Sequence, residues 1–195
     1  MYTLVIVGSR GSGKTSLCAR IVDGARARHM GCCGCLERSI RDASGLPYRI
    51  EIEDIASGAS FLAARRTPDT QTPFEFYSEA FSRARELCVA AIHAQDRHSA
   101  GWPAGTARRI CCIDEIGPLE LTDMGGHREL LERILRDKPI DVLMLTVRPS
   151  LRRELEALLM SRGIDKSEVE VIDTSISNAN GSLIAVDSIL NAAPD

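Results

Sequence analysis

The chain has 195 residues and a formal net charge of −3, with 44% hydrophobic and 26% charged residues. This composition is typical of a soluble globular protein and excludes an intrinsically disordered chain. The length predicts a single domain over residues 1–195, large enough to bury a core without disulfides or metals. The slightly acidic balance argues against nucleic-acid binding, which depends on basic surfaces.

The sequence shows neither a signal peptide nor a membrane-spanning segment. The chain opens with "MYTLVIVGSRGSGKT", in which no basic region precedes the short apolar run, so no signal peptide is predicted. No apolar run approaches the roughly 20 residues that a membrane helix requires. Seven cysteines, an odd number, do not fit a secreted disulfide framework and predict reduced thiols. We therefore expect a cytoplasmic protein that does not associate with membranes.

The first half of the chain begins with a β-branched strand at 3–7, a glycine-rich turn and a helix over 14–28. Two apolar segments, 31–40 and 48–55, flank the turn-rich stretch "RDASGLP" and predict a β-hairpin. Residues 56–73, with their prolines, are expected to form a loop with a short structured piece. Helical spacing of the apolar residues then predicts a helix over 74–95.

The second half of the chain alternates regularly between strands and helices. Strands are predicted at 108–116, 140–147 and 169–173, and amphipathic helices at 126–137, 149–163 and 182–192. Short apolar strands alternating with helices imply right-handed crossover connections. The fold class is therefore expected to be α/β, with a doubly wound, mostly parallel sheet, helices on both faces and an inserted β-hairpin.

The stretch "GSRGSGKT", residues 8–15, matches the phosphate-loop pattern G-x-x-x-x-G-K-[ST] and lies between a predicted strand and a predicted helix. Its glycines let successive backbone N–H groups point inward, forming an anion nest at the positive end of the helix dipole. Lys14 adds a charge for the β- and γ-phosphates, and the Thr15 hydroxyl is a ligand for Mg²⁺. The expected nucleotide-binding residues are Gly8, Ser9, Arg10, Gly11, Ser12, Gly13, Lys14, Thr15 and Ser16.

Two adjacent acids end the strand at 108–116. Asp114 and Glu115 lie at its carboxyl end, the edge at which open α/β sheets bind ligands. Asp114 is expected to hold the Mg²⁺ hydration shell opposite Thr15, and Glu115 to orient or deprotonate the attacking water. Strand alternation predicts that the two carboxylates lie on opposite faces. Glu120, which follows "GPL", either supports this site or is exposed.

Together, "GSRGSGKTSL" and "IDEIGPLEL" resemble the small bacterial and archaeal nucleoside-triphosphatase family of P-loop proteins, over most of residues 1–190. The resemblance implies a P-loop NTPase-type fold and slow hydrolysis of ATP, GTP and other nucleoside triphosphates to diphosphate and phosphate. It implies little base preference and Mg²⁺ as the cofactor. It also carries the roles given above onto Gly13, Lys14, Thr15, Asp114 and Glu115.

Phosphoryl transfer is helped by a cation that meets the charge developing on the phosphates. Arg10, Arg65, Arg66 and Arg148 are the candidates. Arg148 is preferred because it follows the predicted strand 140–147 at the edge where the nucleotide is expected. A surface role for Arg148 remains the alternative.

Two other functions remain open. A nucleotide or small-molecule kinase uses the same loop, although the doubled acid favours hydrolysis. A nucleotide-switched metal-delivery or enzyme-maturation factor is the second alternative, with Cys33 and Cys35 as ligands for its cargo.

The cysteines of "HMGCCGCLER", residues 29–38, have two interpretations. In a strand, Cys33 and Cys35 share one face and Cys32 points to the other, so the three cannot chelate one ion. They are either small buried residues, or Cys33 and Cys35 meet their copies across a homodimer, which would make this hairpin a partner contact. The remaining cysteines, Cys18, Cys88, Cys111 and Cys112, are expected to pack inward as small apolar residues.

Overall fold

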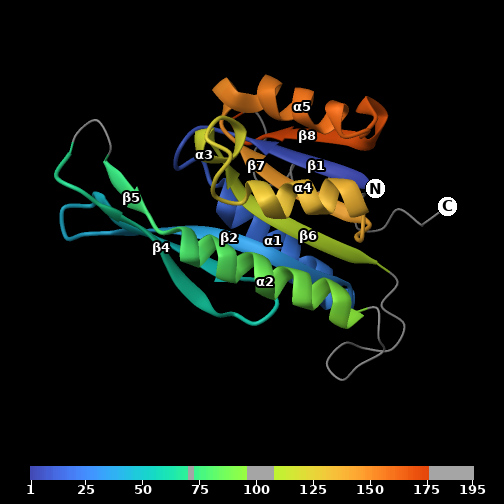
Figure 1. Ribbon diagram of the computed structural model, residues 1–195, viewed down its shortest axis with the longest axis horizontal. Coiled ribbons are helices and arrows are strands. Elements are labelled where there is room, and N and C mark those ends of the chain that lie inside the picture. Colours follow the sequence, from blue (N-terminus) through green and yellow to red (C-terminus); the bar gives the residue numbers. More distant parts are fainter. Residues whose placement is uncertain (70–72, 96–107, 176–195) are drawn as a thin grey trace.

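The computed structural model describes residues 1–69, 73–95 and 108–175, which build one eight-stranded sheet with helices on both faces (Figure 1). The strands lie in the order β5-β4-β3-β2-β6-β7-β1-β8. Their bounds are β1 Tyr2–Val7, β2 Gly31–Arg41, β3 Pro47–Asp54, β4 Ser60–Arg66, β5 Phe74–Phe76, β6 Arg109–Ile116, β7 Val142–Val147 and β8 Val169–Asp173. The α-helices are α1 Lys14–Ala27, α2 Ser78–Gln95, α3 Pro118–Leu121, α4 Arg128–Asp137 and α5 Arg152–Ser161.

The sheet has a parallel half and an antiparallel half. Strands β2, β6, β7, β1 and β8 pair in parallel, and β3, β4 and β5 continue the sheet from β2 by antiparallel pairing. The central strands β1 and β7 are almost entirely apolar, as expected where helices cover both faces of a parallel sheet. The predicted fold class is therefore confirmed, including the β2–β3 hairpin.

The antiparallel half is larger than the sequence pattern predicts. Residues 60–66, expected within a loop, form strand β4, which pairs with β3. The helix expected from residue 74 begins at Ser78, because Phe74–Phe76 instead pairs with β4 as strand β5. Both segments are strands because each pairs with the edge of a neighbouring strand. The local spacing of apolar residues does not encode this pairing. The helix predicted at 182–192 lies outside the described residues.

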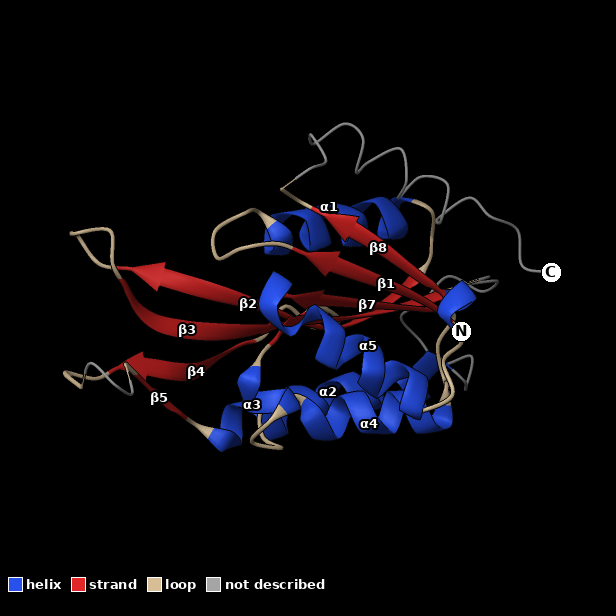
Figure 2. Cartoon of the chain, turned by 90° about the horizontal axis from the view of Figure 1, so that it is seen from above, coloured by secondary structure: helices blue, strands red, loops and turns tan. Residues whose placement is uncertain are grey.

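The two faces of the sheet are covered differently. Figure 2 shows α1 on one face and α2, α4 and α5 on the other. One apolar cluster joins α1 to Leu4, Ile6 and Met144, and a second joins the other three helices to Val5, Ile113 and their neighbours. Helices on both faces are thus confirmed. None of the helices in the described part of the chain is long and apolar enough to cross a membrane.

All seven cysteines are free thiols and all are buried. Cys33 and Cys35 belong to the core cluster under α2, and Cys32 belongs to the cluster under α1, so the predicted alternation is confirmed. The alternative in which Cys33 and Cys35 meet their copies is wrong, because each residue is only 1% exposed. A homodimer or protein partner at residues 29–38 stays a prediction.

Between those two cysteines, Gly34 has a φ of 100°, and a Cβ there would lie 1.9 Å from the carbonyl oxygen of Cys112. Only glycine allows β2 to approach β6 this closely.

Candidate active site

The carboxyl ends of four parallel strands meet at one edge of the sheet. Val7 of β1 pairs with Val147 of β7, and Val147 pairs with Ile116 of β6. On its other side Val7 pairs with Asp173 of β8. The phosphate loop, the two acids of β6 and Arg148 therefore emerge at the same edge, where open α/β sheets bind their ligands.

The phosphate loop has the backbone that its glycines predict. Gly11 and Gly13 have φ values of 77° and 88°, and Gly13 is the residue that caps the N-terminus of α1. At Gly8, a Cβ would lie 2.1 Å from Oγ1 of Thr174 and 2.3 Å from Oγ of Ser12. Oγ1 of Thr174 lies 2.8 Å from Oγ of Ser12, so the end of β8 supports this loop. Sequence reasoning did not identify Thr174.

Lys14 lies in the first turn of α1 and is only 5% exposed. Its ammonium group donates to the carbonyl oxygen of Ser9 at 3.2 Å and lies 3.7 Å from a carboxylate oxygen of Glu115. A buried lysine requires such partners. The predicted phosphate-binding charge is therefore directed into the loop and toward the acids of β6.

Asp114 is fully buried and surrounded by donors. Its carboxylate accepts a hydrogen bond from the Thr146 hydroxyl at 2.7 Å and another from the Glu37 backbone amide at 3.2 Å, and the Thr15 side chain lies close enough to lower its pKa. Burial raises the pKa of Asp114, and these hydrogen bonds act in the opposite direction. A carboxylate beside a threonine hydroxyl is an all-oxygen donor pair, the kind that Mg²⁺ prefers. The residues predicted to hold Mg²⁺ are thus brought together.

Glu115 interrupts the regular strand. Its φ is 61°, and the pairing of β6 with β7 shifts register between Ile113 and Ile116. Its backbone amide donates to the Thr146 hydroxyl at 2.7 Å, and its carboxylate lies 3.1 Å from the guanidinium of Arg148. Regular alternation would carry this side chain to the face opposite Asp114. The left-handed backbone is the kind of strained position that clusters at functional sites.

Besides Thr174, two residues of this arrangement were not found from the sequence. Thr146 contacts both acids through one hydroxyl group, and its signal was a single polar residue in the apolar strand "VLMLTV". Glu37 arrives from β2, and burial, followed by the charges of Asp114 and Glu115, raises the pKa of its carboxyl group well above the ordinary value. No local pattern marks Glu37, because its proximity to Asp114 depends on strand order.

Glu120 is buried just beyond the end of β6. It is 2% exposed, and its carboxylate accepts hydrogen bonds from the backbone amides of Gly117 at 2.9 Å and His127 at 3.0 Å. The exposed alternative for Glu120 is therefore wrong, and the residue caps helix α3. Its neighbour His127 is buried, contacts Cys35 at 3.5 Å, and has a pKa lowered mainly by burial.

The four arginine candidates differ in their position relative to the carboxyl edge of the sheet. Arg148 contacts Glu115, and Arg10 is an exposed residue of the phosphate loop itself. Arg65 and Arg66 lie at the end of β4, and four strands separate β4 from β1 in the sheet. Only Arg10 and Arg148 are therefore placed at the carboxyl edge.

A groove of about 740 Å³ lies elsewhere, between β4 and α2, and its walls include Leu62, Tyr77 and Arg83. None of its lining residues belongs to the phosphate loop or to β6. It is separate from the arrangement described above.

Comparisons with known proteins agree with this geometry. No curated protein matches the chain. The solution structure of a human cancer-related nucleoside triphosphatase is similar in fold, with a TM-score of 0.69 and 16% identity over 100% of both chains. A sequence model of the NTPase family matches residues 3–189, which is nearly the whole chain. The chain therefore belongs to the NTPase family and is a nucleoside-triphosphate hydrolase.

Proposed function

We propose that the chain, as one P-loop domain over residues 1–195, hydrolyses nucleoside triphosphates to diphosphate and phosphate in a Mg²⁺-dependent reaction, with broad base preference. The observation that carries this proposal is the convergence of Lys14, Thr15, Asp114 and Glu115 at one sheet edge. Broad base preference rests on the family resemblance of the two motifs. Location in the cytoplasm stays a prediction from the sequence.

The phosphate loop supplies the binding energy for the triphosphate. Backbone N–H groups of residues 8–16 face the phosphate oxygens at the N-terminus of α1, where the helix dipole favours negative charge. Lys14 neutralises charge on the β- and γ-phosphates. When phosphate enters, the Lys14 ammonium exchanges its 3.7 Å contact with Glu115 for phosphate oxygens.

Thr15 and Asp114 are the residues that hold Mg²⁺ in this proposal. The ion supplies neutralisation of the phosphate charge when it is bound. Asp114 is kept in place by Thr146 and by the Glu37 backbone amide, so its carboxylate does not have to reorganise during the reaction. Glu37 lies beside it as a further carboxyl group, and its side chain is 12% exposed.

Glu115 acts as the general base. Its carboxylate accepts the proton of the water that attacks the γ-phosphorus, and Arg148 beside it at 3.1 Å meets the negative charge that develops on the phosphate. In the free protein Lys14 and Arg148 both contact this carboxylate. Nucleotide binding therefore releases Glu115 from at least one cation and leaves its carboxylate free to accept the proton of the attacking water.

Phosphate release measured against phosphoryl transfer tests this proposal. The protein is incubated with ATP, GTP, CTP and UTP, with and without Mg²⁺, and with nucleoside monophosphates as acceptors. We expect free phosphate from all four substrates, only with Mg²⁺, and no labelled diphosphate formed from the monophosphates. Efficient transfer to an acceptor would replace the hydrolase proposal with the kinase alternative.

The role of Arg148 has its own test. Arg148→Ala is expected to lower kcat about tenfold or more, with a smaller change in KM, because the cation acts on charge that develops in the transition state. Arg152→Ala, one turn further along, is the matched control and keeps wild-type kcat. Equal rates for Arg148→Ala and wild type would assign Arg148 to the surface.

Metal delivery through Cys33 and Cys35 is not proposed. Cargo exchange requires thiols that a partner can reach, and both side chains lie in the core beneath α2.

A further inference from the structure

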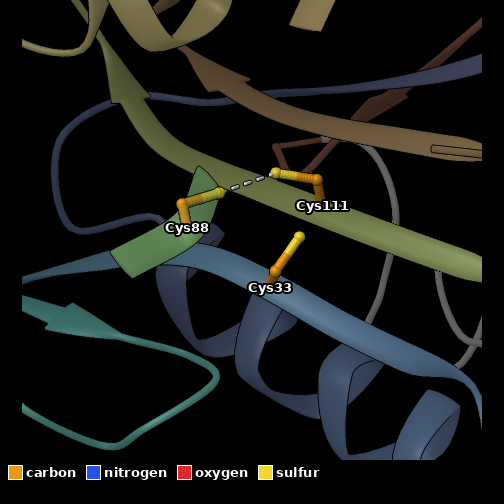
Figure 3. Close-up of side chains that lie close together, drawn as sticks. All are labelled: Cys33, Cys88 and Cys111. Carbon is orange, nitrogen blue, oxygen red and sulfur yellow. Dashed lines mark hydrogen bonds between the residues drawn. The ribbon is translucent and has the colours of Figure 1, made fainter. Parts of the chain in front are cut away.

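Three thiols from three different elements meet in the core, away from the phosphate loop. Cys33 comes from β2, Cys88 from α2 and Cys111 from β6, and Figure 3 shows their sulfur atoms directed toward a common centre. All three sulfur atoms lie within 4.8 Å of one another, and those of Cys88 and Cys111 are 3.8 Å apart. We call these three residues the thiol cluster.

The spacing fits three-coordinate binding. Three sulfurs at about 2.3 Å from a central atom are about 3.4 Å apart when the complex is pyramidal and about 4.0 Å apart when it is planar. The 3.8 Å separation of Cys88 and Cys111 lies between these values and is far longer than the roughly 2.0 Å of a disulfide bond. Structural zinc and iron–sulfur clusters need four ligands, and the described residues bring only three into this group.

The apolar surroundings of the thiol cluster favour a complex without net charge. The thiols lie in the apolar core cluster with Ile113 and Leu131, and each is at most 1% exposed. The titratable groups that act on them are the cluster thiols themselves, Cys32, Cys35 and His127. Burial lowers the pKa of His127, which disfavours a balancing positive charge at that residue. A complex that keeps a net charge here is costly.

Three thiolates carry three negative charges, so a monovalent or divalent ion leaves an anion in this core. A trivalent ion leaves none. We propose that Cys33, Cys88 and Cys111 form a binding site for a trivalent, thiol-seeking metalloid, with arsenite as its probe. In the binding reaction, uncharged arsenous acid loses three As–O bonds and gains three As–S bonds. Each thiol proton leaves with one hydroxide as water, and no atom is oxidised or reduced.

Because the cluster is closed to solvent, loading requires a local opening of α2 from the sheet, and we expect slow uptake that is limited by this opening.

Retention of arsenic by the reduced wild-type protein is the first test. After incubation with arsenite and desalting, we expect one arsenic per chain and three sulfur neighbours by X-ray absorption. No retained arsenic, or fewer than three sulfur neighbours, would overturn the proposal. Retention of Cu(I) in a parallel incubation that leaves arsenite unbound would overturn the trivalent assignment.

Alkylation of the loaded wild-type protein identifies the arsenic-bound thiols without any substitution. The loaded wild-type protein is unfolded in the presence of an alkylating reagent, and we expect Cys33, Cys88 and Cys111 to be protected while the other four cysteines, Cys18, Cys32, Cys35 and Cys112, react. Protection of another set would contradict the proposal. In folded variants, Cys88→Ala is expected to retain at least tenfold less arsenic, and Cys32→Ala, on the opposite face of β2, to retain one equivalent. Equal losses in the two variants would also overturn the assignment.

Discussion

Strand β6 contributes residues to two clusters, one of charged carboxylates and one of neutral thiols. At its carboxyl end, Asp114 and Glu115 are carboxylates held by hydrogen bonds and cations, and near its middle Cys111 meets only neutral groups in an apolar core. Both environments are buried or partly buried on the same strand. The difference shows that partners decide which chemistry a position can hold, more than depth within the fold does.

The largest effect is expected when the charge of one cluster is placed in the other. Cys111→Asp introduces a carboxylate that has no cation or donor positioned for it, at an expected cost of at least 3–5 kcal/mol, roughly the cost of an uncompensated buried charge. We expect little folded protein by circular dichroism. Cys111→Ala, which removes volume without adding charge, is expected to cost about 1 kcal/mol and to remain folded. A stable Cys111→Asp variant would remove the contrast between the two clusters.

The next largest effect is expected from removal of Lys14, the cation beside Glu115 in the polar cluster of Lys14, Asp114 and Glu115. Lys14→Ala is expected to lower kcat for nucleoside-triphosphate hydrolysis about 10²–10³-fold, because a preorganised charge at the phosphates is lost. Lys166→Ala, an exposed lysine remote from the loop, is the control and should match wild type. Phosphate release from Lys14→Ala at the wild-type rate would separate the phosphate loop from the activity.

A smaller effect is expected at Thr146, whose hydroxyl contacts both acids. Thr146→Val keeps the volume but leaves the Glu115 amide without its partner, which we expect to cost about 1–3 kcal/mol of unfolding free energy by urea titration. Thr3→Val is a matched control, since the buried Thr3 hydroxyl has no hydrogen-bond partner among the described residues. We expect Thr3→Val to be neutral or stabilising. Equal losses in both variants would contradict the partner argument.

The smallest effect concerns pH and the neutral thiols. Burial raises the pKa of Cys35 well above its ordinary value, so its contribution to stability is present below the pKa of the unfolded thiol and is lost as pH rises toward the folded value. Between pH 8 and pH 10 we expect Cys35 to account for a loss of about 1–2 kcal/mol. Urea titrations should show a shallower alkaline decline for Cys35→Ala than for wild type. Parallel curves would indicate that this thiol ionises normally.

Much of the polar cluster could be predicted from the sequence because its signals are local. The phosphate loop lies within eight consecutive residues, and Asp114 ends a plainly apolar strand, so both could be assigned from pattern alone. Glu37 and Thr146 could not, because each joins the site through strand order in the sheet. The left-handed backbone of Glu115 also escaped prediction, since regular alternation gives no sign of it.

The same reasoning explains the errors in the antiparallel half and among the cysteines. Strands β4 and β5 are set by pairing with β3, and β5 displaced the start of a helix that local spacing had placed at residue 74. The faces of Cys32, Cys33 and Cys35 followed from the period of a strand. The meeting of Cys33 with Cys88 and Cys111 did not, because it requires β2, β6 and α2 to be placed in three dimensions.

The central claim is that Glu115 is the base for hydrolysis at an edge where Lys14 and the loop hold the nucleotide. Its most direct test measures nucleotide affinity and single-turnover phosphate release for Glu115→Gln, with exposed Glu154→Gln as the control. We predict that Glu115→Gln binds nucleoside triphosphate with an affinity within a few-fold of wild type and releases phosphate about 10²–10⁴-fold more slowly. A Glu115→Gln variant that hydrolyses at the wild-type rate would contradict the account.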